Sequence, residues 1–460
     1  MKSILITFFL CLTLSFGWKV VSASTMLSSR LDTAVAQKAV YIPTKVWRVP
    51  ANNDYSDSTS EYSNSRRAES ANIVLFWAKE YGNRPVQLAD ASKRFDPEEV
   101  LRTCEEFYTA YTQDLKFVEV GNSFADKYKL LMYVFAGDDG TAYGGGAEDK
   151  IGVVWTPAAR INKKPYGALA HEMGHSFQYL AKCDGHWAYS SPAEGSKGQT
   201  IFEMTAQYML WQVYPNWITF ENYHLQGFME KTHYAFLHET NQYHAPFVLE
   251  YWSDLHGVDF VGKMWRLAQR GEDPVLTYKR LLDMDQAHFN DELFAGYLRF
   301  ITWDLPRIRE VSKAYANQHK TKLDRVADNT WRIAPGNAPQ NYGYNAIPLA
   351  IPDKGLAKIS LSFAGKTSLD GYRIRHPEEA GWRYGFLAVT KDGTRHYGDV
   401  HQQDKAKVGF AVPAETTHLW LVVMGAPKQH RIHLVDGKEE TDEQWPYEIQ
   451  LTGTSPLSDR

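Results

Sequence analysis

His171-Glu172-Met173-Gly174-His175-Ser176-Phe177-Gln178 is the stretch that decides how the rest of this 460-residue chain is interpreted. The two histidines are four residues apart, so on an α-helix their rings leave the same face about one turn apart. This spacing allows two imidazole nitrogens to bind one Zn²⁺ ion. Glu172 lies between them, where it reaches a water rather than the metal, which is the general-base position of this motif.

The residues around the motif predict a helix over Tyr166–Ala181. At 100° per residue its apolar residues form one stripe opposite the histidines, and Gln178 falls on the histidine side. The stripe consists of Leu169, Met173, Phe177 and Leu180. Such a helix packs against a core while it presents both histidines to a cleft. A HExxH string arises by chance in about one or two random chains per hundred of this length, and the helical context argues against chance here.

A third protein ligand is needed, because a catalytic zinc usually has three. Glu203 lies at the edge of the apolar stripe of a helix expected over Gln199–Tyr214. The small Ala206 one turn later allows this helix to pack close to the metal helix, so we expect Glu203 to be the third ligand. Glu194, on a Ser/Pro loop, is the alternative carboxylate.

An enzyme of this kind also needs a group that stabilises the developing oxyanion. Tyr243 and His244, at the start of the helix expected over His244–His256, are the candidates. The alternative is that these residues, with His233 and His238, form an ordinary aromatic surface.

The motif and its distant glutamate resemble the HExGHxxQ signature of glutamate-liganded zincin metallopeptidases, which include enhancin-like, mucin-degrading enzymes. Residues 71–303 also resemble an uncharacterised family of secreted bacterial proteins in the same clan, in which Tyr143-Gly144-Gly145-Gly146 precedes the metal helix and the glutamate helix reads like Phe202-Glu203-Met204-Thr205-Ala206-Gln207. The resemblance implies His171, His175 and Glu203 as zinc ligands and Glu172 as the base. The acid-valine-threonine sequence that the enhancin-like group has around its third ligand is absent here.

The N-terminal residues predict export. A charged start, an apolar run and Val21-Ser22-Ala23 are typical of a signal peptide over residues 1–23, so we expect a secreted protein with no membrane span in its mature form. A poorly ordered leader rich in Ser, Asn, Asp and Thr is expected over residues 24–70.

Residues 71–335 are expected to form the zincin-like catalytic domain, a mixed sheet with a helical subdomain. The sequence predicts strands over Ala71–Ala78, Lys129–Ala136 and Ile151–Thr156, a helix over Pro97–Leu115 and a loop over Gly137–Lys150. The strand around Ile151–Trp155 is expected at a sheet edge, where an extended substrate can pair with it.

Residues 336–460 change character, with Pro and Gly between short alternating runs that predict an all-β sandwich. We expect this domain to contribute no zinc ligand, because none of its histidines is paired with an acid at a metal-ligand spacing. It is a candidate for contact with glycans. The fold class is therefore α+β.

The sequence thus predicts a secreted Zn²⁺-dependent metallohydrolase, a peptidase that acts on extracellular proteins, peptides or glycoproteins. A net charge of -4 provides no basic surface for nucleic acid. Two alternatives remain open: a zinc-dependent glycan- or ester-cleaving hydrolase on the same scaffold, and a carbohydrate- or protein-binding protein whose zinc is structural and closed by a fourth ligand such as His186. Cys104 and Cys183 either pair or remain two separate thiols.

Overall fold

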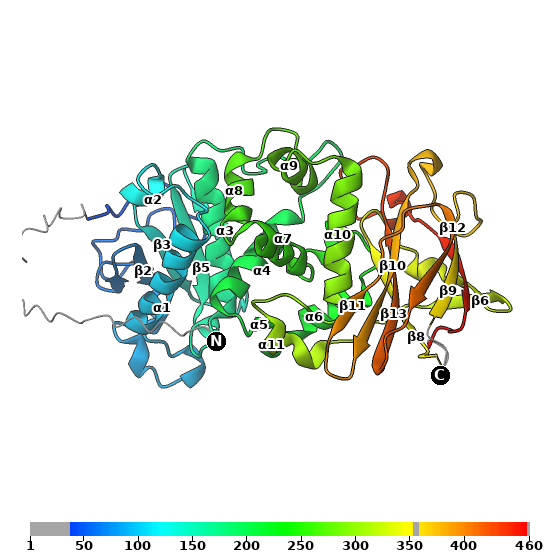
Figure 1. Cartoon of the computed structure of the whole chain (residues 1–460). Helices are drawn as coiled ribbons and strands as arrows, with labels where there is room; N and C mark the ends of the chain where they lie inside the picture. The colour runs from blue at the N-terminus through cyan, green and yellow to red at the C-terminus, as the bar shows by residue number, and fades with distance from the viewer. Residues whose placement is uncertain (1–36, 353–357, 458–460) are drawn as a thin grey trace, which may run out of the picture. The chain divides into compact units, whose positions relative to one another are not determined.

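Five short strands in the first third of the chain form one mixed sheet in the computed structural model (Figure 1). The structure describes residues 37–352 and 358–457, so the signal peptide expected over residues 1–23 lies outside it. The strand order is β1-β2-β3-β5-β4, with β2, β3 and β5 parallel and the two edge strands antiparallel. The strands are β1 (Arg67–Glu69), β2 (Ile73–Trp77), β3 (Leu130–Phe135), β4 (Tyr143–Ala147) and β5 (Ile151–Pro157).

The three central strands are buried along their whole length, which explains their continuous apolar sequences. Helix α1 (Pro97–Thr109) packs beside β2 and begins where the Asp96 side chain accepts a hydrogen bond from the Glu98 amide. It continues as a π-helical turn over Ala110–Asp114. The short α2 (Phe124–Lys127) leads into β3.

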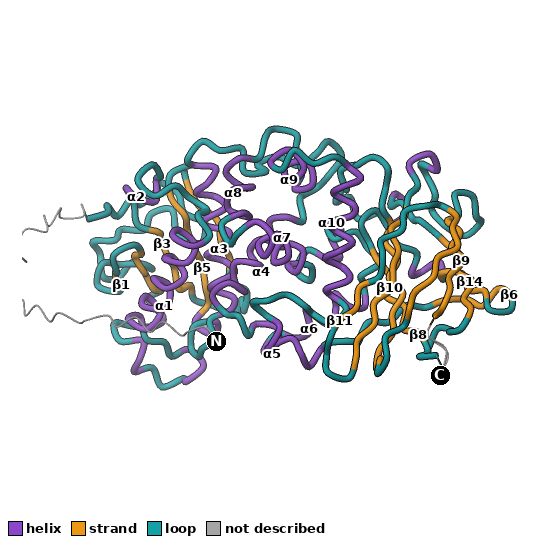
Figure 2. Tube along the Cα trace, in the orientation of Figure 1, coloured by secondary structure: helices purple, strands orange, loops and turns teal. Residues whose placement is uncertain are grey.

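A helical region follows the sheet, and Figure 2 shows its helices between the strands of the first sheet and those of the C-terminal region. Helix α3 lies along β4 and β5 and packs against α4. The helices are α3 (Gly167–Cys183), α4 (Ile201–Val213), α5 (Trp217–Phe220), α6 (Asn222–Glu230), α7 (Pro246–His256), α8 (Phe260–Leu267), α9 (Pro274–Leu281), α10 (Gln286–Phe300) and α11 (Arg309–Ser312).

The C-terminal region is a β-sandwich of two antiparallel sheets, with strand orders β11-β10-β13-β8 and β12-β9-β14-β7-β6. Side chains from both sheets share one apolar core. The strands are β6 (Leu323–Ala327), β7 (Thr330–Ile333), β8 (Tyr344–Leu349), β9 (Lys358–Gly365), β10 (Trp382–Thr390), β11 (Arg395–Tyr397), β12 (Lys405–Ala411), β13 (Thr416–Gly425) and β14 (Tyr447–Thr452). The molecule is therefore α+β with a β-rich C-terminal region.

Three details differ from the sequence-based expectation. Strands β6 and β7 precede the expected boundary at residue 335 and still belong to the sandwich, because β7 pairs with β14. The expected loop Gly137–Lys150 contains β4, which makes β4 and not β5 the sheet edge. The glycine run concealed this strand, since glycine has low β-propensity and presents no side-chain alternation.

The leader expected to be poorly ordered over residues 24–70 is held in place in its described part, from residue 37 onward. The Asn53 side chain exchanges two 3.0 Å hydrogen bonds with the backbone of Tyr62, which is only 1% exposed. The indole of Trp155 donates to the carbonyl of Trp47 at 2.8 Å. These bonds hold the described part of the leader in place, which the composition alone did not reveal.

Two further expectations concern the cysteines and the membrane. Cys104 and Cys183 are both free thiols. Among the described residues, no helix combines the length and the apolar character that crossing a bilayer requires.

Candidate metal centre

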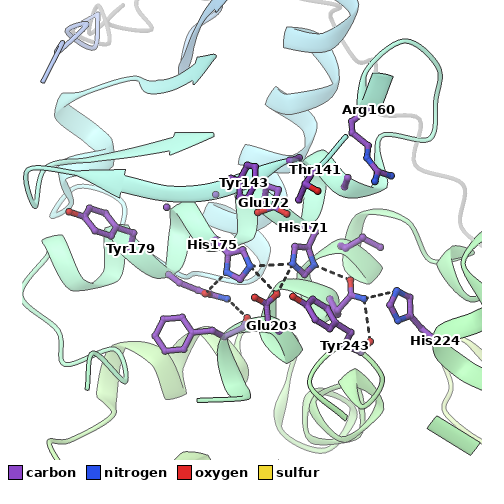
Figure 3. A pocket seen from close by; sticks show the side chains of 18 of the residues that line it. Thr141, Tyr143, Arg160, His171, Glu172, His175, Tyr179, Glu203, His224 and Tyr243 are labelled. Atoms are coloured by element: carbon purple, nitrogen blue, oxygen red, sulfur yellow. Dashed lines mark hydrogen bonds and ion pairs between the residues drawn. The ribbon is translucent and has the colours of Figure 1, made fainter. Parts of the chain in front are cut away.

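Three side chains from two helices converge at one point of the structure (Figure 3). His171 and His175 come from α3, and Glu203 comes from the first turn of α4. The Nε2 atoms of the two histidines are 3.2 Å apart. Glu203 Oε2 lies 3.0 Å from His171 Nε2 and 3.2 Å from His175 Nε2. The sequence-predicted ligands therefore form one compact triangle of donor atoms.

Close packing of α3 against α4 brings the acid to the histidines. A Cβ atom added at Gly174 would lie 3.3 Å from the Cα atom of Ala206, so the helix backbones approach closely where both residues are small. Glu203 lies one turn before Ala206 and faces α3. The small side chain of Ala206 therefore allows the close packing that the sequence predicts. Gly174 is the residue opposite it on α3.

The hydrogen bonds of the two histidines fix which nitrogen carries the proton. Gln178 donates from Nε2 to the carbonyl of Phe202 at 2.8 Å, so its Oε1 faces His175 Nδ1 at 3.0 Å and must accept a proton from it. Gln207 Oε1 accepts from His171 Nδ1 at 3.0 Å in the same way. Both Nδ1 atoms are therefore protonated, so in the neutral form of each ring the lone pair is on Nε2, the nitrogen that faces Glu203.

This arrangement fits a zinc ion. Two nitrogen lone pairs and a carboxylate oxygen repel one another unless a cation lies among them. Zinc binds such donors at about 2.0–2.1 Å in tetrahedral geometry, which places neighbouring donors about 3.3–3.4 Å apart, close to the separations of 3.0 to 3.2 Å seen here. Second-sphere bonds from Nδ1 are also typical of zinc-binding histidines.

A second group of metal-ligand residue types does not fit a metal in the same way. It comprises His238, His433 and Asp442. His238 Nδ1 accepts from the Thr240 amide at 3.0 Å, so its proton is on Nε2, which donates to Asp442 Oδ2 at 3.1 Å. The nitrogen that would face a metal is occupied by hydrogen, and this cluster is a satisfied hydrogen-bond network.

Glu172 lines the same cavity and lies on the β4 side of the histidines in Figure 3. Burial raises the pKa of its carboxyl group, although a hydrogen bond from the Gly144 amide acts in the opposite direction. Glu203 differs, because its Oε2 lies between the Nε2 atoms of the two histidines. The two carboxylates therefore have different environments, one beside the cluster and one within it.

The two candidates for oxyanion stabilisation occupy different places. The ring of Tyr243 stacks at 6.0 Å on that of His171 and lines the cavity, with 38% of the residue exposed. Burial, and then the charge of Glu203, raise the pKa of Tyr243 to about 12, so its hydroxyl remains a donor. His244 is not among the residues that line this cavity, and its Nδ1 lies 3.0 Å from His224 Nδ1.

The cavity over the cluster has a volume of about 870 Å³, and its walls come from β4, α3, α4, the first turn of α6 and neighbouring loops. Tyrosines stand on several sides of it, together with the exposed Arg160 and Lys182. The tyrosines are Tyr143, Tyr179, Tyr223 and Tyr243.

The alternative ligands lie elsewhere. Glu194 is exposed and lines a different, smaller cavity. Neither Glu194 nor His186 belongs to either group of possible metal ligands among the described residues.

Sequence reasoning did not identify Gln207 and His224 as part of the site. Gln207 lies four residues after Glu203 on the same helix, a spacing that could have placed it beside the metal helix. His224 bonds to Gln207 from 17 positions further along, and no sequence pattern marks it.

The model described as "Family of unknown function (DUF6055)" matches residues 32–458. No curated protein matches the chain significantly. Among solved structures, the Yersinia pseudotuberculosis-derived mitogen is 10% identical with a TM-score of 0.17 and covers 29% of this chain and 86% of its own. A structure of accessory secretory proteins 1, 2 and 3 of Streptococcus pneumoniae is 8% identical with a TM-score of 0.17, covering 30% of this chain and 87% of that one. Neither likeness carries an argument about function.

Proposed function

Because this chain belongs to DUF6055, a family of unknown function, we propose its function from the site: it is a zinc-dependent metallohydrolase of the zincin type that cleaves peptide bonds in extracellular proteins or glycoproteins. The observation that carries the proposal is the convergence of two Nε2 lone pairs and Glu203 Oε2 beside Glu172 in one open cavity.

The residues have distinct tasks in this proposal. His171, His175 and Glu203 hold the ion, which when bound supplies a Lewis acid that activates water and polarises a carbonyl. Glu172 accepts a proton on its carboxylate and later passes it to the leaving amine. The Tyr243 hydroxyl lies across the cluster from β4, where it can donate to the oxygen of the carbonyl under attack.

The edge strand β4 suits a peptide substrate. Tyr143, Gly144 and Gly145 line the cavity, and one side of β4 pairs with β5 while the other side has no neighbouring strand among the described residues. An extended peptide can add to such an edge through backbone hydrogen bonds. The sequence predicts that the substrate pairs with β5, but β4 is the strand at the sheet edge, so we propose β4 for this contact.

The surroundings of the cluster argue against a structural zinc. A structural site is closed by four protein ligands. Here the group of possible ligands has three members within the described part of the chain, and it faces the cavity. An acid beside the cluster, Glu172, also has no task in a purely structural site. The signal peptide expected over residues 1–23 supports an extracellular substrate.

The proposal is tested by cleavage of labelled casein and a labelled secreted glycoprotein with the zinc-loaded chain. We expect the wild type to cleave at least one of them. Glu172→Gln should keep its zinc and lose about 10²- to 10⁴-fold in turnover, because the variant removes the base and leaves the ligands. Glu194→Gln, at an exposed acid outside the site, is the matched control and should behave as wild type. Full activity in Glu172→Gln, or a zinc-loaded wild type that hydrolyses neither substrate, would contradict the proposal.

A further inference from the structure

Gln207 is the point at which the metal cluster is joined to the loop that carries Tyr243. The residue is 3% exposed and lies on α4, four residues after Glu203. Its Oε1 lies 3.0 Å from His171 Nδ1. Its Nε2 lies 3.2 Å from the carbonyl oxygen of Tyr243 and 3.2 Å from His224 Nε2. One buried carboxamide therefore contacts three separate segments of the chain.

The carbonyl of Tyr243 determines the orientation of this carboxamide. A carbonyl oxygen only accepts hydrogen bonds, so the NH₂ group of Gln207 must point to it and the oxygen must point to His171. The second N–H of Gln207 then donates to His224 Nε2. His224 consequently carries its proton on Nδ1 and donates it to His244 Nδ1 at 3.0 Å.

Every donor in this chain of hydrogen bonds has one acceptor, and the direction runs from His171 to Gln207 to His224 to His244. A protonated Nδ1 on His171 is the tautomer whose Nε2 can bind a metal. His244 accepts the last hydrogen bond of this series, from His224. It therefore contributes to the series of hydrogen bonds and not to the wall of the cavity. His175 depends on a different carboxamide, Gln178, which does not contact Tyr243.

We infer that Gln207, supported by His224, is a positioning residue that fixes the metal-binding tautomer of His171 and at the same time holds the backbone of Tyr243 in place across the cavity. The inference rests on the proposed function. A carboxamide is required for both tasks, because it accepts at Oε1 and donates twice at Nε2. A carboxylate could only accept, so it would serve His171 and oppose the Tyr243 carbonyl.

The test separates the two tasks with Gln207→Leu and Gln207→Glu, and measures the zinc dissociation constant by competition with a chelator. Gln207→Leu should weaken zinc binding by about 10- to 100-fold, as the loss of such outer hydrogen bonds does at other metal sites. Gln207→Glu should bind zinc nearly as tightly as wild type. Gln212→Leu, which removes another partly buried carboxamide of α4 whose contact is with Glu250, is the matched control and should leave the zinc affinity unchanged.

A second readout follows the tautomer itself. Long-range nitrogen–hydrogen NMR spectra of the zinc-free protein labelled at histidine should show His171 protonated at Nδ1 in wild type and in Gln212→Leu. Gln207→Leu should show a mixture of tautomers. Loss of fold alone would affect every histidine signal, whereas the inference predicts a change confined to His171 and the His224–His244 pair.

Cleavage of the substrates named above tests the Tyr243 part. Gln207→Glu should lose up to about 100-fold in turnover while it keeps its zinc, since a small displacement of a group in the site is enough for such a loss. Wild-type zinc affinity in Gln207→Leu, or full turnover in Gln207→Glu, would overturn the inference while the proposed function stands. If the wild type binds zinc and cleaves nothing, the proposed function fails, and the zinc affinities and tautomers still decide the first half of the inference.

Discussion

Glu203 is the third ligand of the proposed zinc site, and without it only the two histidine nitrogens would bind the ion. Glu203→Ala should weaken zinc binding by far more than Glu194→Ala, which removes an exposed acid and should change it little. Calorimetric titration of zinc into both metal-free variants measures the difference. Equal affinities would mean that Glu203 is not a ligand.

Individual residues of the site differed in how far the sequence revealed them. His171, Glu172 and His175 follow from helical spacing, and Glu203 followed from a short helix with a small residue one turn later. The spacing of Gln207 from Glu203 could have placed it beside the metal helix, but its contact with a carbonyl 36 residues away could not be deduced. The contact of His224 could not be deduced either, because it comes from another helix. The position of Tyr243 and His244 at the start of a predicted helix made both of them candidates for oxyanion stabilisation, but only Tyr243 lines the cavity.

At the scale of elements, β4 is the strand whose sequence is most tightly constrained by the metal helix. A Cβ atom at Gly144 would lie 1.8 Å from the backbone oxygen of Glu172, whereas one at Gly145 would meet nothing within 4 Å. Gly144→Ala should therefore displace β4 or α3 and destabilise the protein by about 1–3 kcal/mol. Gly145→Ala, on the same strand, should cost less than that. Thermal and urea unfolding of both zinc-free variants would check this, and equal stability of the two would contradict the close packing.

Most elements could be predicted because one rule dominated each of them. Buried strands such as β2 and β3 are continuous apolar runs, and α1 has a capping acid and a proline at its start. β4 could not, since its glycines serve a contact with α3 and not a local preference. The order of the described part of the leader was not predicted for a similar reason, because the leader bonds to strands that are distant in sequence, such as β5.

At the scale of the whole molecule, the central strands β10 and β13 of the sheet β11-β10-β13-β8 are buried on both faces along most of their length. Leu419, Leu421 and Val423 of β13 belong to the sandwich core, while the alternate residues Trp420 and Val422 belong to the core of the helical region. The sequence predicted a sandwich here but not this second face, because alternation does not show what covers either side.

A chain that ends near residue 320 would thus lose the cover of its helical core. We expect it to aggregate or to melt well below the full chain, even though its ligands are intact. Thermal melting and binding of a hydrophobic dye, measured on both proteins without zinc, test this. A shortened chain with the melting temperature of the full one would show that the two regions are independent.

A buried histidine at this junction should make stability depend on pH. His319 bonds to the Tyr344 hydroxyl at 2.9 Å, and burial lowers its pKa to about 3 from an ordinary 6.5. As the pH falls, the unfolded chain binds a proton at this histidine at a higher pH than the folded protein does. The contribution of neutral His319 to the free energy of unfolding is therefore complete above about pH 6.5 and decreases as the pH falls toward 3.

Between pH 7 and 5 the loss should be about 2 kcal/mol, and His319→Phe should reduce it. Urea unfolding in the presence of a chelator at both pH values gives the free energies. His288→Phe, at an exposed histidine, should leave the pH dependence as in wild type. An unchanged slope in His319→Phe would contradict this reading of the junction.

The central claim is that His171, His175 and Glu203 bind one zinc ion, and the zinc content of the purified chain tests it most directly. Elemental analysis should find one zinc per wild-type molecule and none in the double variant His171→Ala/His175→Ala, with Glu172→Gln retaining the full amount. A wild type that neither contains zinc nor takes it up, or a double variant that keeps one zinc per molecule, would contradict the claim.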